Sequence, residues 1–111
     1  MRWIRSRLLV WAIPEFWLWE ADMPSREIEI QNELGLHARA TAKLCKLAGA
    51  HASEVWLTCR GRRVNGKSIM GVLTLAAGKG RTVLIETEGE DAQAALDALC
   101  ALVDDKFGEE R

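Results

Sequence analysis

The 111-residue sequence contains few of the residues that build metal sites or disulfide frameworks. Its three cysteines, Cys45, Cys59 and Cys100, are odd in number and form no Cys-x-x-Cys pair. Each falls within an expected helix or strand, so we expect small buried or half-buried thiols and a reducing, cytoplasmic location. With only two histidines and no paired cysteines, the sequence offers no metal site.

Long apolar runs are also missing. The run from Leu8 to Ile13 is too short to span a membrane, and Pro14-Glu15 interrupts it before any signal-peptide cleavage site. We therefore expect no stable membrane insertion. Four of the five tryptophans lie in residues 1–23, together with several arginines. An interfacial helix is an alternative for this stretch, because Trp and Arg favour membrane surfaces.

Charge of one sign is not in excess, since the net charge is only −1. This small value does not indicate nucleic-acid binding. The basic residues nevertheless gather in the middle of the chain, at Arg39, Lys43, Lys46, Arg60, Arg62, Arg63 and Lys67, whereas acids dominate from Glu86 onward. A basic surface would suit phosphate and an acidic protein partner, although such charges also form ordinary solvated faces.

The most informative stretch is Gly35–Ala40, where a strand pattern gives way to a helical one. Residues Arg26–Gln31 alternate, with Ile28 and Ile30 on one face. An apolar stripe at helical spacing then follows, formed by Ala40, Leu44, Leu47 and Ala48. His37 should therefore stand at the first turn of a helix, where backbone N–H groups lack an intrahelical partner.

This position gives His37 a chemical role. Unpaired N–H groups and the positive end of the helix dipole attract phosphate, and the guanidinium of Arg39 can bind phosphate oxygens with two hydrogen bonds. A neutral imidazole is nucleophilic near neutral pH. The pattern is typical of a phosphohistidine site. The alternative is a capping or surface histidine, the role we assign to His51, near which the sequence places no orienting residue.

The remaining patterns predict a small mixed fold. Strands are expected at Glu54–Cys59, Arg62–Asn65 and Arg81–Thr87, a short helix from Ser68 through Leu75, and a final helix after Gly89. In the order β-α-β-β-α-β-α, these elements predict an α+β fold, an open-faced β-sandwich whose four-stranded antiparallel sheet is covered on one face by three helices.

Two motifs resemble the HPr family, the histidine-containing phosphocarriers of the bacterial sugar phosphotransferase system. Gly35-Leu36-His37-Ala38-Arg39 resembles its active-site segment, and Gly66-Lys67-Ser68-Ile69-Met70-Gly71-Val72 its regulatory serine segment. The reactive histidine and the serine lie 31 residues apart, as in the family. The similarity runs from about Met23 to the C-terminus, and the family's fold agrees with the pattern above.

The resemblance implies a phosphotransferase-system component that carries a phosphohistidine, rather than a stand-alone enzyme, and that needs no cofactor. His37 Nδ1 would accept the phosphoryl group from enzyme I and pass it to an enzyme IIA protein. Arg39 and the N–H groups of Ala38 to Ala40 would bind the phosphate. Partners would dock on a surface formed by Ala38, Ala42, Lys46, Ile69 and Met70, and the protein is expected to be a monomer.

Ser68 has two interpretations. It can cap the helix that it precedes, or, by resemblance, it can be phosphorylated by an HPr serine kinase/phosphorylase.

Two departures from the family are visible: Ala40 replaces a common proline and so restores an N–H donor, and Leu34 replaces an asparagine. Residues 1–23 have no counterpart in the family and are expected to be disordered or to arise from an early start codon, leaving residues 24–111 as the domain.

Two alternatives of function remain. The same fold can serve as a regulatory or nitrogen-branch HPr paralogue that acts by protein binding. It can also serve as a module that binds RNA or an anion on the cluster Arg60, Arg62, Arg63 and Lys67. The second lacks an aromatic pair on the sheet, because Trp56 has no aromatic neighbour on another strand, so we expect that side chain simply to pack.

Overall fold

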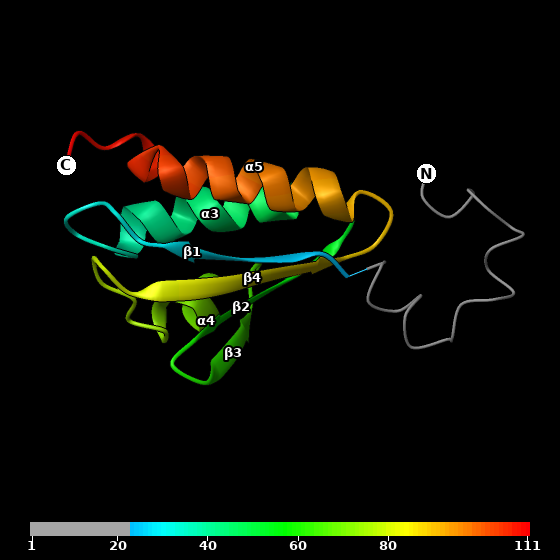
Figure 1. Cartoon of the computed structure of the whole chain (residues 1–111), viewed down its shortest axis with the longest axis horizontal. Helices are drawn as coiled ribbons and strands as arrows, with labels where there is room; N and C mark the ends of the chain where they lie inside the picture. The colour runs from blue at the N-terminus through cyan, green and yellow to red at the C-terminus, as the bar shows by residue number, and fades with distance from the viewer. Residues whose placement is uncertain (1–22) are drawn as a thin grey trace, which may run out of the picture.

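The computed structural model describes residues 23–111, and the predictions made for residues 1–22 lie outside this range. Along the chain, the elements are β1 (Ser25–Glu29), α3 (Ala38–Gly49), β2 (Glu54–Cys59), β3 (Arg62–Asn65), α4 (Ile69–Leu73), β4 (Thr82–Glu88), α5 (Ala92–Asp104) and a 3-10 turn, η2 (Lys106–Gly108). The expected order of strands and helices is confirmed (Figure 1).

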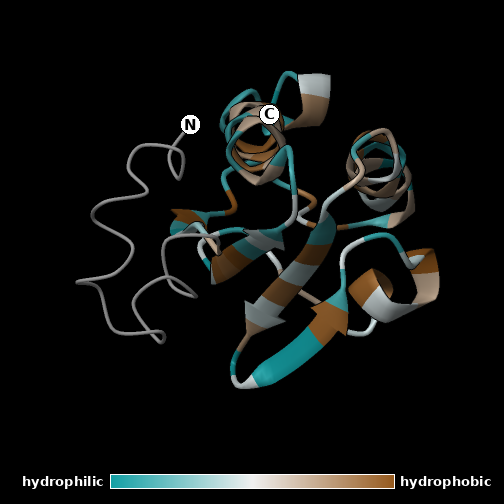
Figure 2. Cartoon of the chain, turned by 90° about the vertical axis from the view of Figure 1, so that its right-hand side faces the viewer, coloured by the Kyte–Doolittle hydropathy of each residue, from teal (hydrophilic) through white to brown (hydrophobic). Residues whose placement is uncertain are grey.

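The four strands form one sheet in the order β1-β4-β2-β3, and every neighbouring pair is antiparallel. β4 is therefore a central strand, in which Ile85 lies opposite Leu57 of β2 and Arg26 of β1. The helices cover one face of this sheet and leave the other open (Figure 2). The expected α+β open-faced sandwich is confirmed.

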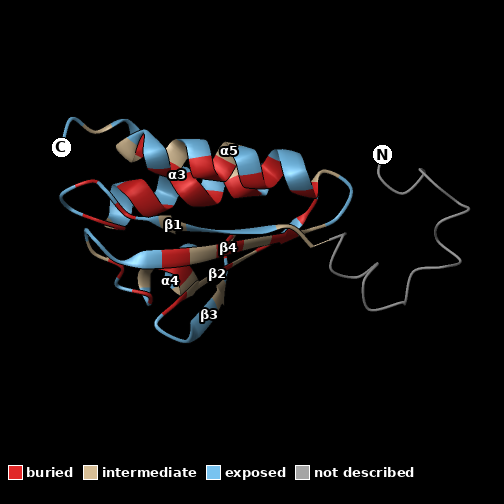
Figure 3. Cartoon of the chain, viewed as in Figure 1, coloured by how far each residue is buried: buried red, intermediate tan, exposed pale blue. Residues whose placement is uncertain are grey.

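The strand pattern decides which face the helices cover. In β2, Val55, Leu57 and Cys59 are buried, whereas Trp56 and Thr58 point to the other face and are only partly covered. β4 alternates in the same way, with Val83 and Ile85 buried. The helices α3 and α5 turn their buried stripes toward this side of the sheet (Figure 3).

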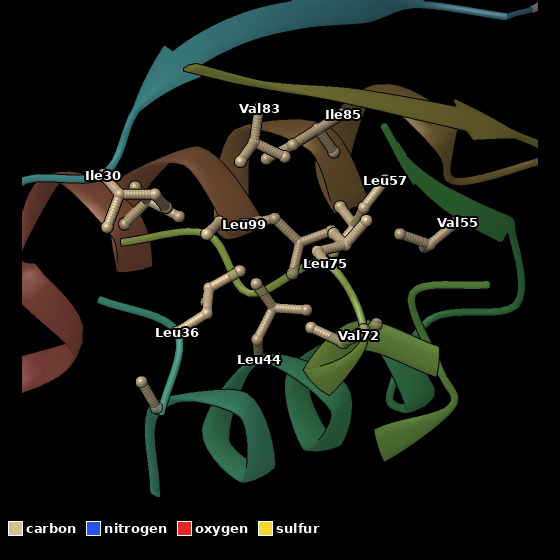
Figure 4. Close-up of a cluster of buried hydrophobic side chains, with 14 of the residues drawn as sticks. Ile30, Leu36, Leu44, Val55, Leu57, Val72, Leu75, Val83, Ile85 and Leu99 are labelled. Carbon is tan, nitrogen blue, oxygen red and sulfur yellow. The ribbon is translucent and has the colours of Figure 1, made fainter. Parts of the chain in front are cut away.

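All three helices contribute to the core. Leu44 of α3, Val72 of α4 and Leu99 of α5 are at most 2% exposed and belong to one cluster with the inward-facing strand residues (Figure 4). The three cysteines are buried and unpaired, as expected. Burial raises the pKa of Cys45 and of Cys100, so both remain protonated, unreactive thiols.

Element ends differ from the prediction by one or two residues. β1 ends at Glu29, yet Ile30 is 1% exposed, because its N–H still donates to Arg81 O and its carbonyl accepts from Gly80 N. The ladder of β4 runs over Thr82–Glu88. Helix α4 ends at Leu73, two residues early, because the chain soon enters the left-handed region at Ala76 (φ 47°).

Of two expectations about single side chains, that for His51 needs correction and that for Trp56 is confirmed. His51 was expected to lack an orienting partner, but its Nδ1 lies 3.1 Å from the carbonyl oxygen of Leu47 and the ring is partly buried. Trp56 does pack, but on the open face of the sheet, where the guanidinium of Arg63 lies 4.4 Å from the ring centre. A cation over the ring is a favourable contact for a partly exposed aromatic residue.

Candidate functional site

Gly35 and Leu36 set the position of His37. Gly35 has φ +66°, and a Cβ there would lie 2.6 Å from Ala77 O, so only glycine fits this approach. The N–H of Leu36 donates to the same Ala77 oxygen at 2.9 Å, and the Leu36 side chain is buried. The loop before α3 is thereby held against the segment between α4 and β4, and His37 follows with a fixed backbone.

His37 is the N-cap residue of α3. Its backbone is extended (φ −82°, ψ 179°), and its carbonyl accepts the first helical hydrogen bond, from Thr41 N at 2.8 Å. Its side chain makes no capping bond, so the ring is available for other contacts. The N–H groups of Ala38, Arg39 and Ala40 occupy the first turn, where an α-helix supplies no partner. The expected start of a helix at His37 is confirmed. Free N–H groups of a first turn are donors of the kind that suit an anion.

The imidazole of His37 pairs with a carboxylate from the other end of the chain. Nε2 lies 2.5 Å from Glu109 Oε2, and the two side chains are 25% and 15% exposed. Asn32, fully buried, donates from Nδ2 to Glu109 Oε1 and to Gly35 O, each at 2.9 Å. Within residues 23–111, no group bonds to His37 Nδ1. The structure therefore distinguishes the two ring nitrogens.

The C-terminal segment is anchored so that Glu109 reaches the histidine. Phe107 is fully buried, and the ammonium of Lys43 donates to its carbonyl oxygen at 2.7 Å. Beyond Glu109, the N–H of Glu33 donates to Arg111 O at 3.1 Å. The C-terminus lies beside the loop before α3 in Figure 1. Anchors on both sides of Glu109 thus hold its side chain over the site.

Electrostatics keep Glu109 ionised. Partial burial raises the pKa of its carboxyl group, but the hydrogen bonds from Asn32 and His37, with the charge of Lys43, lower that pKa by more. The pKa of Glu109 consequently lies below its usual range. At neutral pH the group is a carboxylate, which can only accept hydrogen bonds.

A hollow of about 660 Å³ opens beside His37. Its lining residues are Glu33, Leu34, His37, Ala38, Arg39, Glu109, Glu110 and Arg111. The structure thus brings His37 and Arg39 together, as the motif predicts. The expectation of a basic surface here is only partly right, because three glutamates share the hollow with the two arginines. The added acids come from the loop before α3 and from the C-terminal segment.

The residues assigned to docking lie on two adjacent helices. Ala38, Ala42 and Lys46 are exposed on α3, and Ile69 and Met70 are 47% and 74% exposed on α4, which contacts α3. Leu34, interpreted from sequence only as a lost asparagine, is 70% exposed and lines the hollow. The surface beside His37 is therefore more apolar than the motif alone indicates.

Ser68 caps α4, as the simpler of its two interpretations predicts. Its Oγ accepts a hydrogen bond from Gly71 N at 3.1 Å, and the residue is partly exposed. Directly after it come the exposed Ile69 and Met70. The hydroxyl is thus at the edge of the apolar surface formed by these two side chains.

Asn32, Glu109 and Arg111 were not identified from the sequence. Glu109 lies 72 residues from His37 along the chain, and no local pattern connects the two. In the described part of the chain, no group of three or more His, Cys, Asp or Glu side chains could hold a metal ion. No helix there is both long and apolar enough to cross a membrane.

Comparisons with known proteins point to one family. A family model described as "PTS HPr component phosphorylation site" matches residues 24–105. The phosphocarrier protein HPr of Cupriavidus necator is 56% identical over 87 residues, which cover 78% of this chain and 98% of that protein. The phosphocarrier protein NPr of Shewanella violacea is 45% identical over 84 residues, which cover 76% of this chain and 92% of that protein.

A solved structure gives the same result for the fold. The crystal structure of an HPr from Thermoanaerobacter tengcongensis superposes with a TM-score of 0.77 and 40% identity, covering 79% of this chain and 99% of that one. Since the family model spans most of the chain and the relatives align over nearly their whole length, the chain belongs to the HPr family of phosphocarriers of the phosphotransferase system.

Proposed function

We propose that this protein carries a phosphoryl group on Nδ1 of His37, received from enzyme I and passed to a histidine of an enzyme IIA protein. The observation that carries this proposal is the position of His37 at the N-terminus of α3, with Nε2 paired to Glu109 and Nδ1 unpaired within residues 23–111. One nitrogen is thus left free to act as a nucleophile next to an anion-binding helix end.

The transfer step is a displacement at phosphorus. The lone pair of His37 Nδ1 forms the new N–P bond while the N–P bond to the enzyme I histidine breaks and returns its electron pair to that ring. Arg39 and the first-turn N–H groups of Ala38 to Ala40 would stabilise the phosphoryl oxygens. Positioning and charge stabilisation account for the step, and no metal ligand on this chain is needed.

Partner docking is proposed for the exposed residues of α3 and α4 beside the site, namely Ala38, Ala42, Lys46, Ile69 and Met70. Exposed Ile69 and Met70 provide apolar area that a partner can bury, and Lys46 provides a charge for an acidic surface. We place this exchange in the cytoplasm, with the protein acting as a monomer.

Regulation at Ser68 is a further part of the proposal. A serine kinase that modifies the hydroxyl would place up to about two negative charges at the edge of the docking surface. The capping bond to Gly71 N is compatible with this, because a phosphate oxygen can accept the same hydrogen bond at a helix N-terminus.

A nitrogen-branch role is the second candidate, and the similarity to the NPr of Shewanella violacea favours it.

The RNA-binding alternative is disfavoured by internal contacts of its basic cluster. Arg60 donates to Leu75 O, Arg63 covers Trp56 and bonds Glu86, and Lys67 donates to His51 O. Three of the four cations of the cluster, and the aromatic face that RNA would need, are thus already engaged within the protein.

Incubation with enzyme I and phosphoenolpyruvate tests the proposal. We expect mass spectrometry to find one added phosphoryl group, labile in acid and stable in base, as an N–P bond is. The group should be absent from His37→Ala and present in the matched control His51→Ala. Labelling that survives His37→Ala would falsify the assignment. Enzyme I proteins of the sugar and nitrogen branches, compared for rate, distinguish the two candidate roles.

A further inference from the structure

We propose that Glu109 is a positioning residue for phosphoryl transfer, whose carboxylate keeps the hydrogen of the neutral His37 ring on Nε2 and so presents Nδ1 as the nucleophile. This inference rests on the proposed function of His37. The residue that would select the nucleophilic nitrogen, Glu109, lies 72 residues from His37 and outside the active-site motif.

The first step concerns the proton between the two side chains. Glu109 Oε2 lies 2.5 Å from His37 Nε2, and an ionised carboxylate has no hydrogen to donate. The shared hydrogen must therefore belong to the ring nitrogen. A neutral imidazole with its hydrogen on Nε2 has its free lone pair on Nδ1, which is the atom required to attack phosphorus.

The second step concerns how the carboxylate is held. Asn32 Nδ2 lies 2.9 Å from Glu109 Oε1 and 2.9 Å from Gly35 O. Both contacts are acceptors, so the amide must present its NH₂ group to them, which fixes its orientation. Since Asn32 is fully buried, it braces Glu109 and the loop before His37 at the same time.

The third step concerns charge. When Nδ1 takes the phosphoryl group, the ring keeps its hydrogen on Nε2 and becomes positively charged. The Glu109 carboxylate then faces this new charge at contact distance. A docked partner excludes water from the hollow and strengthens the attraction. When the phosphoryl group leaves, the N–P electron pair returns to Nδ1, and the hydrogen stays on Nε2 throughout.

Asn32 makes the proposal sharply testable. In Glu109→Gln, Asn32 would donate its hydrogen bond to the side-chain oxygen of the new glutamine. The NH₂ group of that glutamine would then point at His37 Nε2. That nitrogen would then have to accept, and the ring hydrogen would move to Nδ1. Glu109→Ala places neither a donor nor an acceptor beside Nε2, so the Nδ1–H and Nε2–H forms of the neutral ring should both be populated. Glutamine, the closer replacement in shape, should therefore harm transfer more than alanine.

The first measurement is the position of the ring hydrogen, read from two-bond ¹H–¹⁵N correlation spectra of His37 at a pH where the ring is neutral. We expect the Nε2–H form to dominate in the wild type, a mixture in Glu109→Ala, and mainly Nδ1–H in Glu109→Gln. Glu54→Gln, a change at an exposed glutamate of β2 that lies outside the hollow and makes no side-chain hydrogen bond within residues 23–111, should match the wild type. A wild-type ring with its hydrogen on Nδ1 would overturn the proposal.

The second measurement is the rate of phosphoryl acceptance from enzyme I. We expect a loss of about tenfold in Glu109→Ala, the scale of losing an orienting partner. In Glu109→Gln the loss should be on the order of 10²-fold, the scale of a misplaced catalytic proton. A merely structural role predicts the reverse order, with glutamine closer to the wild type, and that order would refute the inference. A wild type without any phosphoryl group on His37 would instead refute the proposed function, while the spectra would still test Glu109.

Discussion

The ammonium group of Lys43 donates a hydrogen bond to the carbonyl oxygen of Phe107, 2.7 Å away, and so fastens the C-terminal segment to helix α3. Both Lys106 and Phe107 have positive φ values, 55° and 57°, a conformation that costs free energy in residues other than glycine. The buried ring of Phe107 and the bond from Lys43 hold the chain in this turn. Gly108, also with positive φ, then leads into Glu109.

Loss of this bond should loosen the segment that carries Glu109. We expect Lys43→Met to lower the free energy of unfolding by about 1 kcal/mol, the scale of one hydrogen bond. Faster amide exchange should be confined to Gly108 and Glu109, whose N–H groups bond to Asp105 O and Lys106 O. Lys79→Met, at an exposed lysine with no side-chain bond in the described chain, is the control. Unchanged exchange in Lys43→Met would contradict the anchoring role.

Gly35 and Gly49 should respond in opposite ways to the same substitution. In Gly35→Ala, the new methyl group would meet Ala77 O and Gly78 Cα at 2.6 and 2.7 Å, in a backbone with φ +66°. We expect a loss of roughly 1–3 kcal/mol. At Gly49, the end of α3, a Cβ would meet no atom within 4 Å, and φ is not positive. Gly49→Ala should therefore be neutral or stabilise by up to about 1 kcal/mol.

Thermal unfolding checks both glycine variants, and phosphoryl acceptance gives a second readout. Gly35→Ala should slow acceptance even at temperatures where the variant is fully folded, because the loop sets the position of His37. Equal rates for the folded Gly35→Ala and Gly49→Ala proteins would show that the histidine tolerates movement of this loop.

Asp91 joins the start of α5 to the loop after α3. Its carboxylate accepts hydrogen bonds from the N–H groups of Ala52 and Ser53, at 3.0 and 2.9 Å, and from the Ser53 hydroxyl. The bond from Ser53 Oγ is the main reason that the pKa of Asp91 is lowered, and the two backbone bonds add to it against a smaller effect of burial. The ionised form is thus favoured in the folded protein.

A lowered pKa fixes the sign of the pH dependence. The unfolded chain takes up the proton first, at the ordinary value of 3.8, so the stabilisation by Asp91 is fully present above that pH. It is lost as the pH falls through the lower pKa of the folded state. We expect Asp91→Asn to be less stable than the wild type at neutral pH, and the difference to shrink in strong acid. Glu90→Gln is the control, and a difference that grows on acidification would contradict this assignment.

Local sequence predicted the half of the site that lies in one stretch. His37, Arg39 and the first-turn N–H groups occupy consecutive positions, so strand and helix periods were enough to place them at one helix end. The buried stripes of the strands and helices followed from the same periods, and these fixed the layers of the fold.

The rest of the site depends on contacts between residues far apart in the sequence, which the strand and helix periodicity does not predict. Glu109 reaches His37 because a pair of left-handed residues turns the chain after α5, and no typical helix-stop signal predicts such a turn in lysine and phenylalanine. No local pattern singles out Asn32, and only the distances show that it bridges Gly35 and Glu109. Similarly, no local pattern shows that the oxygens of Asp91 accept hydrogen bonds from a loop 38 and 39 residues away.

Ser68 can be separated into a capping role and a regulatory role by two substitutions. Its hydroxyl caps α4 through Gly71 N. Ser68→Ala removes this acceptor and should lower the free energy of unfolding by about 1 kcal/mol. Ser68→Asp keeps an acceptor and puts a negative charge at the positive end of the helix, so its stability should stay within about 1 kcal/mol of the wild type.

The order of the two variants should reverse when the rate of phosphoryl acceptance from enzyme I is measured, because Ser68→Asp should then be the more impaired. Ser68→Asp puts a charge next to Ile69 and Met70, the exposed apolar residues assigned to docking. A partner would have to desolvate this charge, and an acidic partner would also be repelled. We expect acceptance at His37 to slow at least several-fold in Ser68→Asp and to keep the wild-type rate in Ser68→Ala. Equal rates in Ser68→Asp and the wild type would leave Ser68 with its capping role alone, whereas slowing in both variants would assign the effect to α4 rather than to charge.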